Sequence, residues 1–267
     1  MTENPLLNYQ LQLPQSTSQG DDHTLPTLVF LHGMFGDLNN LGILARAYAE
    51  HFPLLRIDLR NHGHSFQHAE MNYELMAHDV IRLIDHLKLE RLILIGHSMG
   101  GKTAMKIAAL LPNRVEKLVV LDIAPVAYHE NHHDAVFKAL FAVKQARPQS
   151  RQQADPILQR HIQQLGVRQF MLKSFAPQQP DCFLFNLTAL YNNYPDLLNW
   201  QAVYCDTPTL LIKGGRSSYI LPEYKDAILT QFPNATAFTI SRSGHWIHSD
   251  SPELVIKAID RFLALIR

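Results

Sequence analysis

Short apolar runs and amphipathic segments alternate along the chain from residue 27 onward. An apolar run that is bounded by turn residues is typical of a strand buried on both faces, whereas apolar residues at every third or fourth position predict a helix. Regular alternation of the two predicts an α/β fold with a mostly parallel sheet and helices on both faces. Before the first interruption, the expected strands are 27–33, 54–60, 91–96 and 117–125, and the expected helices are 39–52, 73–88 and 99–111.

The alternation is interrupted between residues 125 and 204, where helix-like segments are separated by stretches rich in Pro and Gln. We therefore expect a core domain made of residues 1–124 and 205–267, with residues 125–204 as a helical cap inserted before the penultimate strands. Residues 8–13 alternate in polarity and predict an antiparallel edge strand. The remaining expected helices are 132–146, 155–166, 167–175, 186–194, 222–232 and 251–267, and the remaining strands are 207–215 and 235–240.

Composition and charge exclude several classes of protein. The chain of 267 residues has 24 Lys and Arg against 24 Asp and Glu, so its net charge gives no reason to expect a nucleic acid partner. No run is long and apolar enough for a membrane span, and the N-terminus lacks an export signal, which predicts a soluble cytoplasmic protein. Cys182 and Cys205 are far apart, so we expect reduced thiols rather than a disulfide framework or a zinc site.

Ser98 lies in the sequence G-x-S-x-G, between an expected strand and an expected helix. In a nucleophile elbow, the strand and the helix approach so closely that only small side chains fit two positions before and after the serine, and Gly96 and Gly100 meet this need. The expected turn places Ser98 at the carboxyl edge of the sheet and at a helix N-terminus. This context favours a nucleophile over a serine that only caps a helix, and it makes the Met99 N–H an oxyanion donor.

A serine nucleophile needs a general base and a second oxyanion donor. His245 lies after the expected strand 235–240 and before the C-terminal helix, at the same edge of the sheet. We therefore predict His245 as the base, with His248 from the same loop as the alternative. Met34 follows the expected strand 27–33, and we predict that its backbone N–H is the second oxyanion donor. We expect Phe35, His97 and Trp246 to bind the substrate.

Four motifs, LHGMFG, IDLRNHGHS, GHSMGG and SGHWIHSD, follow one another over nearly the whole chain. With these motifs the chain resembles the α/β-hydrolase superfamily. Together with LDIAPVAYH, they make it similar to the small bacterial esterases of the YbfF type. The resemblance implies a serine esterase that hydrolyses small-molecule acyl esters or thioesters such as acyl-CoA, with a helical cap over the site. The expected chemistry needs neither a metal nor an organic cofactor.

The acid that orients the base departs from the common pattern of the superfamily, in which it follows the strand after the cap. In this chain Ser217 and Ser218 occupy that region, and the next carboxylate is Glu223. Asp122 instead ends the apolar strand just before the cap, where a buried carboxylate would need a compensating partner such as the His245 Nδ1–H. We predict Asp122 as the acid, in agreement with the acid placement of YbfF-type esterases. The alternatives are Glu223 or a purely structural Asp122.

Residues 129–133, HENHH, match the zinc-protease motif H-E-x-x-H. That motif requires a continuous helix that places His129 and His133 on one face, together with a third ligand. Because these residues follow Pro125 closely and fall at or before the start of the expected helix, we predict no metal site here.

Two other classes of function need the same three catalytic residues or the same scaffold: a carbon–carbon bond hydrolase, and a ligand receptor built on a hydrolase fold.

Two groups of side chains in the cap are relevant to the kind of substrate. Its apolar residues either line an acyl pocket or pack the helices, and they are Phe137, Leu140, Phe141, Phe170, Met171 and Phe175. Its basic residues either bind the phosphates of coenzyme A or form a solvated face, and they are Lys138, Lys144, Arg147, Arg151, Arg160, Arg168 and Lys173.

Overall fold

The computed structural model describes residues 5–14, 25–130 and 133–264. In this part of the chain the strands form one seven-stranded sheet in the order β1-β3-β2-β4-β5-β6-β7. Neighbouring strands are parallel except β1, which pairs with β3 in the antiparallel direction, as the sequence predicts for residues 8–13. The strands are β1 (Tyr9–Gln12), β2 (Thr27–Leu31), β3 (Leu54–Ile57), β4 (Leu92–His97), β5 (Val115–Leu121), β6 (Thr209–Gly214) and β7 (Ala235–Ile240).

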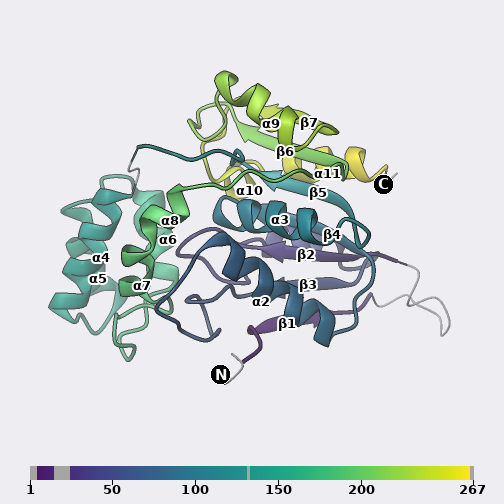
Figure 1. Ribbon diagram of the computed structural model, residues 1–267. Helices are drawn as coiled ribbons and strands as arrows, with labels where there is room; N and C mark the ends of the chain where they lie inside the picture. Colours follow the sequence, from purple (N-terminus) through teal and green to yellow (C-terminus); the bar gives the residue numbers. More distant parts are fainter. Residues whose placement is uncertain (1–4, 15–24, 131–132, 265–267) are drawn as a thin grey trace.

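Helices cover both faces of the sheet because alternate residues of each central strand point to opposite sides. In β4, Leu92 and Leu94 pack in a core with α2 and α3, whereas Ile93 and Ile95 pack in a second core with α1 and α11. The two layers are visible on either side of the sheet in Figure 1. The helices outside the insertion are α1 (Gly42–Tyr48), α2 (Tyr73–His86), α3 (Met99–Leu110), α9 (Lys225–Gln231), α10 (Ile247–Asp250) and α11 (Pro252–Leu263), with the 3₁₀ turn η1 (Pro222–Tyr224) before α9.

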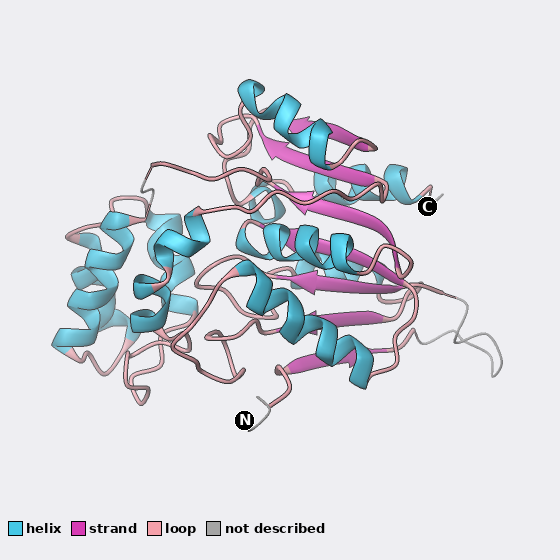
Figure 2. Cartoon of the chain, in the orientation of Figure 1, coloured by secondary structure: helices cyan, strands magenta, loops and turns pink. Residues whose placement is uncertain are grey.

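The chain between β5 and β6 forms a separate group of helices, which we call the helical insertion. Figure 2 shows these helices beyond the end of the sheet to which the arrows of the parallel strands point. Loops at the carboxyl ends of the strands therefore face the insertion, which is where open α/β sheets place their ligands. The helices are α4 (Asp134–Ala146), α5 (Arg151–Gln159), α6 (Leu165–Lys173), α7 (Leu187–Asn192) and α8 (Tyr194–Leu198).

Several helices differ in their bounds from the sequence prediction, and α5, α8 and α10 are the clearest cases. Helix α5 begins at Arg151 rather than at residue 155, because the Ser150 side chain accepts a hydrogen bond from the Gln153 N–H and caps the helix. The short helices α8 and α10 were not predicted; each spans so few residues that it leaves no periodic pattern to detect. No helix in the described ranges has the length and apolar content that crossing a membrane requires.

Candidate active site

Ser98 occupies a strained turn between β4 and α3. Its backbone has φ 53° and ψ −120°, a region that residues with a side chain rarely adopt. The turn leaves the hydroxyl at the carboxyl edge of the sheet, and Met99 becomes the first residue of α3, so its N–H has no acceptor within the helix. Ser98 therefore has beside its hydroxyl a backbone N–H that no hydrogen bond among the described residues uses.

The turn depends on two glycines that allow the strand and the helix to approach closely. A Cβ atom built on Gly96 would lie 2.3 Å from the Gly100 carbonyl oxygen, and one built on Gly100 would lie 2.3 Å from the Leu31 carbonyl oxygen. Neither position has room for a side chain, because the neighbouring atoms belong to the backbone. The geometry meets the requirement that the G-x-S-x-G sequence predicts.

We expect Gly100→Ala to destabilise the protein by about 1–3 kcal/mol, because its methyl group would overlap the backbone of β2. The resulting displacement of α3 should lower kcat/KM by about 100-fold, since a shift of about 1 Å misplaces the hydroxyl. Urea unfolding and steady-state kinetics measure the two effects. The matched control is Gly166→Ala in α6, where a Cβ would meet no atom within 4 Å. Unchanged activity in Gly100→Ala would contradict the close approach.

The imidazole of His245 links Ser98 to Asp122. His245 Nε2 lies 3.0 Å from Ser98 Oγ, and His245 Nδ1 lies 2.8 Å from Asp122 Oδ2. A carboxylate can only accept, so Nδ1 carries the proton and donates it to Asp122, which leaves Nε2 free to accept from the Ser98 hydroxyl. The sequence places these three residues at the ends of three different strands, and the structure brings them together.

Asp122 is fully buried and its carboxylate has a complete set of donors. Oδ1 accepts from the Gly214 N–H at 2.8 Å, and Oδ2 accepts from His245 and from the Ser217 hydroxyl. Ser217 lies in the region where most superfamily members carry the acid. Here its hydroxyl donates a hydrogen bond to the carboxylate of Asp122, which directly follows β5. The other candidate acid, Glu223, lies exposed in η1. The geometry therefore favours Asp122 over Glu223 as the partner of His245.

The loop after β2 faces Ser98 and includes Met34. Within this loop the Gly36 N–H donates to the Gly33 carbonyl and the Phe35 N–H donates to His62, while no hydrogen bond within the described residues uses the Met34 N–H. Phe35 has φ 65°, so the loop holds a left-handed residue without a glycine. The Met34 N–H, like that of Met99, is therefore not used in a hydrogen bond among the described residues, and its role as an oxyanion donor stays a prediction.

Two buried histidines hold this loop in place. His32 donates from Nδ1 to the Gly33 carbonyl at 2.8 Å and accepts at Nε2 from the Leu59 N–H at 3.1 Å, and His62 Nε2 accepts from the Phe35 N–H at 3.1 Å. Both rings must be neutral to accept, and burial lowers the pKa of each. The part that His62 plays in shaping the loop is a finding of the structure.

We expect acid to destabilise the protein because its buried histidines are neutral. Burial lowers the pKa of His62 and of His248 from 6.5 to about 3. Between pH 6.5 and about 3, the two histidines bind protons in the unfolded chain but not in the folded chain. Their contribution to the free energy of unfolding is therefore fully present above pH 6.5 and is lost as the pH decreases toward 3. Each group contributes about 1 kcal/mol per pH unit in that window.

Urea unfolding at pH 7, 5.5 and 4.5 measures this loss of stability. His248→Gln should reduce the pH dependence, whereas the same change at the exposed His64 should leave it unaltered. An identical pH dependence for the wild type and His248→Gln would contradict a neutral, buried His248.

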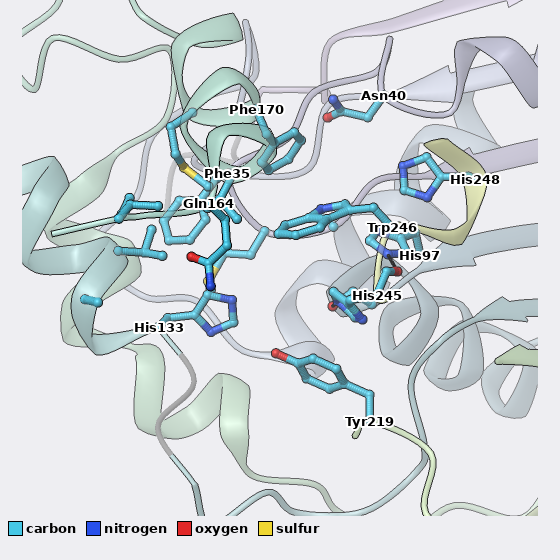
Figure 3. Close-up of a pocket in the computed structure, with 18 of the residues that line it drawn as sticks. Phe35, Asn40, His97, His133, Gln164, Phe170, Tyr219, His245, Trp246 and His248 are labelled. Atoms are coloured by element: carbon cyan, nitrogen blue, oxygen red, sulfur yellow. Dashed lines mark hydrogen bonds between the residues drawn. The ribbon is translucent and has the colours of Figure 1, made fainter. Parts of the chain in front are cut away.

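A cavity of about 430 Å³ opens above Ser98, between the core and the helical insertion. We call it the large cavity. Phe35, His97 and Trp246, the residues expected beside the substrate, all line it. Figure 3 shows Trp246 between Phe170 and His245. The insertion contributes apolar residues to the wall: Val136, Ile162, Val167, Phe170 and Met171.

Only part of the apolar surface expected from the insertion reaches the large cavity. Phe170 and Met171 line it, whereas Phe137, Leu140 and Phe175 pack in the hydrophobic core. His248, the alternative base, lies in α10 against the His97 ring, with centroids 4.4 Å apart, and His245 rather than His248 contacts Ser98. For the apolar residues of the insertion, sequence periodicity cannot distinguish those that line the cavity from those that pack in the core, because both follow the same helical spacing.

Two residues near Ser98 carry no signal in the sequence. The Tyr219 ring stacks on His245 at 4.0 Å and lines the large cavity. Lys102 is fully buried one turn after Ser98, and burial lowers its pKa to about 7. The Lys102 Nζ donates to the Val126 carbonyl at 2.8 Å and the Asn199 carbonyl at 3.4 Å, at the two connections of the helical insertion. Lys102 therefore ties both connections to α3.

The residues of the H-E-x-x-H motif do not form a metal site in the described part of the chain. His133 precedes the first residue of α4, and its Nδ1 lies 2.7 Å from the Tyr194 hydroxyl. Residues 131–132 of the motif lie outside the described ranges. Among the described residues, no cluster of three His, Cys, Asp or Glu side chains could hold a metal ion.

Comparison with known proteins identifies the family. Residues 26–252 match the model of the α/β-hydrolase fold, so the chain belongs to this family. A Haemophilus influenzae protein provisionally named an esterase/lipase is 58% identical over 258 residues, which cover 97% of this chain and 88% of the relative. Esterase YbfF of Escherichia coli is 41% identical over 255 residues, covering 95% and 99%. A marine microorganism esterase of known structure has a TM-score of 0.88 at 30% identity, covering 96% and 99%.

Proposed function

We propose that the protein is a serine carboxylesterase that uses Ser98, His245 and Asp122 as a catalytic triad. The observation that carries the proposal is the unbroken chain of contacts, 3.0 Å from Ser98 Oγ to His245 Nε2 and 2.8 Å from His245 Nδ1 to Asp122. The esterase names of relatives that match nearly the full chain support the same activity.

In the proposed mechanism, Ser98 Oγ attacks the ester carbonyl while His245 takes its proton. Asp122 holds the ring of His245 and stabilises its protonated form. The N–H groups of Met34 and Met99 bind the negative oxygen of the tetrahedral intermediate. His245 then donates the proton to the leaving alcohol, and water releases the acyl group from Ser98 by the same steps.

The large cavity favours an uncharged substrate. None of its described lining residues is Asp, Glu, Lys or Arg. Several basic residues of the insertion instead pair with carboxylates, which supports a surface role over binding of coenzyme A phosphates. The pairs are Lys138 with Asp134 at 2.9 Å, Lys144 with Asp181 at 2.6 Å, and Arg168 with Asp155 at 2.8 Å.

We also propose that residues 125–204 act as a cap over the site. The insertion supplies Phe170 and Met171 to the wall of the large cavity, and its Ser174 hydroxyl donates to the Phe35 carbonyl at 3.1 Å. The cap thus forms one wall of the site and also supports the loop that carries Met34.

Steady-state hydrolysis of p-nitrophenyl acetate and p-nitrophenyl butanoate tests the esterase activity. Wild-type protein should complete many turnovers at a rate that a metal chelator leaves unchanged, because no step uses a metal. A folded protein that hydrolyses no ester would contradict the proposal and would favour a carbon–carbon hydrolase or a receptor.

A further inference from the structure

A second, much smaller cavity also adjoins Ser98. Its volume is about 40 Å³, and we call it the small cavity. Four residues, Met34, Ser98, His133 and Tyr219, line both cavities, so the two spaces meet at the nucleophile. His245, Trp246 and His248 line the large cavity alone, whereas Met99, Lys102, Ile123 and Leu197 line the small cavity alone.

The chemistry of acyl transfer decides which part of an ester enters each cavity. The leaving oxygen must lie within reach of His245 Nε2, because that atom returns the proton to it. The rest of the leaving group then extends into the large cavity, which His245 lines. The carbonyl oxygen points toward the N–H groups of Met34 and Met99. The acyl substituent is left with the small cavity, which Ser98 lines and His245 does not.

The two volumes set the sizes of the two groups. For comparison, an apolar cavity of about 150 Å³ binds a benzene ring. The small cavity, at about 40 Å³, has room for a group of one or two carbons. The large cavity, at about 430 Å³, lies within the range of roughly 300–1,000 Å³ that holds drug-sized molecules.

Hydrogen bonds fix the walls of the small cavity. The Tyr73 hydroxyl donates to the Leu197 carbonyl at 2.7 Å, and the Tyr128 hydroxyl donates to the Tyr219 carbonyl at 2.6 Å. Lys102 Nζ donates to the Val126 carbonyl at 2.8 Å. Tyr73, Tyr128 and Lys102 are all buried, so widening the space would break hydrogen bonds that water cannot replace. The small cavity therefore cannot easily widen to hold a longer acyl chain.

We propose that the protein selects esters with a short acyl group, acetyl or propionyl, on a bulky and uncharged leaving alcohol. This proposal rests on the proposed function, since it assigns the two halves of the ester to the two cavities beside the triad. The small cavity holds the acyl group, and the large cavity holds the leaving group.

Two series of substrates test the assignment. In the first, the leaving group is 1-naphthol and the acyl group grows from acetyl through propionyl and butanoyl to hexanoyl. We expect kcat/KM to fall at least about tenfold between propionyl and butanoyl, and further at hexanoyl. In the second series the acyl group is acetyl and the leaving alcohol grows from phenol to 1-naphthol, with kcat/KM expected to be constant or to rise.

Matched variants locate the effect. Leu197→Ala enlarges the small cavity and should restore hydrolysis of the butanoyl ester to within about threefold of the acetyl ester. Ile162→Ala enlarges only the large cavity and should leave the acyl preference unchanged. Ile123→Val is a milder change to the small cavity that provides the same test if Leu197→Ala does not fold.

The outcomes separate the two proposals. If no ester of either series is hydrolysed, the proposed function itself fails. If the wild type hydrolyses esters but kcat/KM is flat or rises from acetyl to hexanoyl, the esterase stands and the assignment of the cavities is wrong. A shift of acyl preference in Ile162→Ala, with none in Leu197→Ala or Ile123→Val, would place the acyl group in the large cavity.

Discussion

Ser98→Ala is expected to lower kcat by roughly 10⁶-fold, to a residual rate supplied by the oxyanion donors and by binding alone. In the proposed mechanism, the substitution removes the oxygen that attacks the carbonyl, so His245 has no hydroxyl to activate. Steady-state hydrolysis of p-nitrophenyl acetate measures the loss. The fold should survive, because alanine is smaller than serine and the turn that holds residue 98 rests on Gly96 and Gly100.

A matched serine variant controls for this result. Ser241 is exposed and lies outside both cavities, so Ser241→Ala should hydrolyse p-nitrophenyl acetate as fast as the wild type. A Ser98→Ala protein that retained more than about one thousandth of the wild-type rate would show that another group attacks the ester.

Asp122→Asn is expected to lower kcat by about 10⁴-fold with little change in the fold. An asparagine keeps the size of the side chain, but its amide can present N–H groups to His245 Nδ1 and so favour the tautomer that carries the proton on Nε2. That tautomer cannot accept the Ser98 proton. The loss of charge also removes the stabilisation of protonated His245, so the loss should fall on kcat and leave KM nearly unchanged.

The control for this substitution is Glu223→Gln, at the other carboxylate that the sequence offers as the acid. Because Glu223 lies exposed in η1, its change should leave kcat within twofold of the wild type. A large loss in Glu223→Gln together with full activity in Asp122→Asn would reverse the assignment of the acid.

That Ser98, His245 and Asp122 lie together could be predicted from the sequence, because each of the three residues follows a strong local pattern. Ser98 and Asp122 each follow a buried strand, and His245 lies in the loop after the last strand. The carboxyl ends of parallel strands share one edge of the sheet, so residues distant in the chain can be placed together before any contact is known. The glycines beside Ser98 add a steric requirement that few other turns impose.

Other parts of the site depend on contacts that no local pattern encodes. Tyr219 stacks on His245 from a loop after β6, and Lys102 contacts both connections of the helical insertion. Lysine in a helix predicts an exposed side chain, yet this one is fully buried. The division of the site into two cavities likewise follows from packing between the core and the insertion. Sequence periodicity predicts which residues are apolar but not which of them leave a space.

Labelling with a reactive phosphonate ester tests the central claim, that Ser98 is the nucleophile of a serine hydrolase, most directly. Intact-mass measurement should find one phosphonyl group per chain of the wild type, with activity lost in proportion, and peptide mapping should locate it on Ser98. Ser98→Ala should remain unlabelled. A label on another residue, or an active enzyme that the phosphonate neither labels nor inhibits, would contradict the assignment.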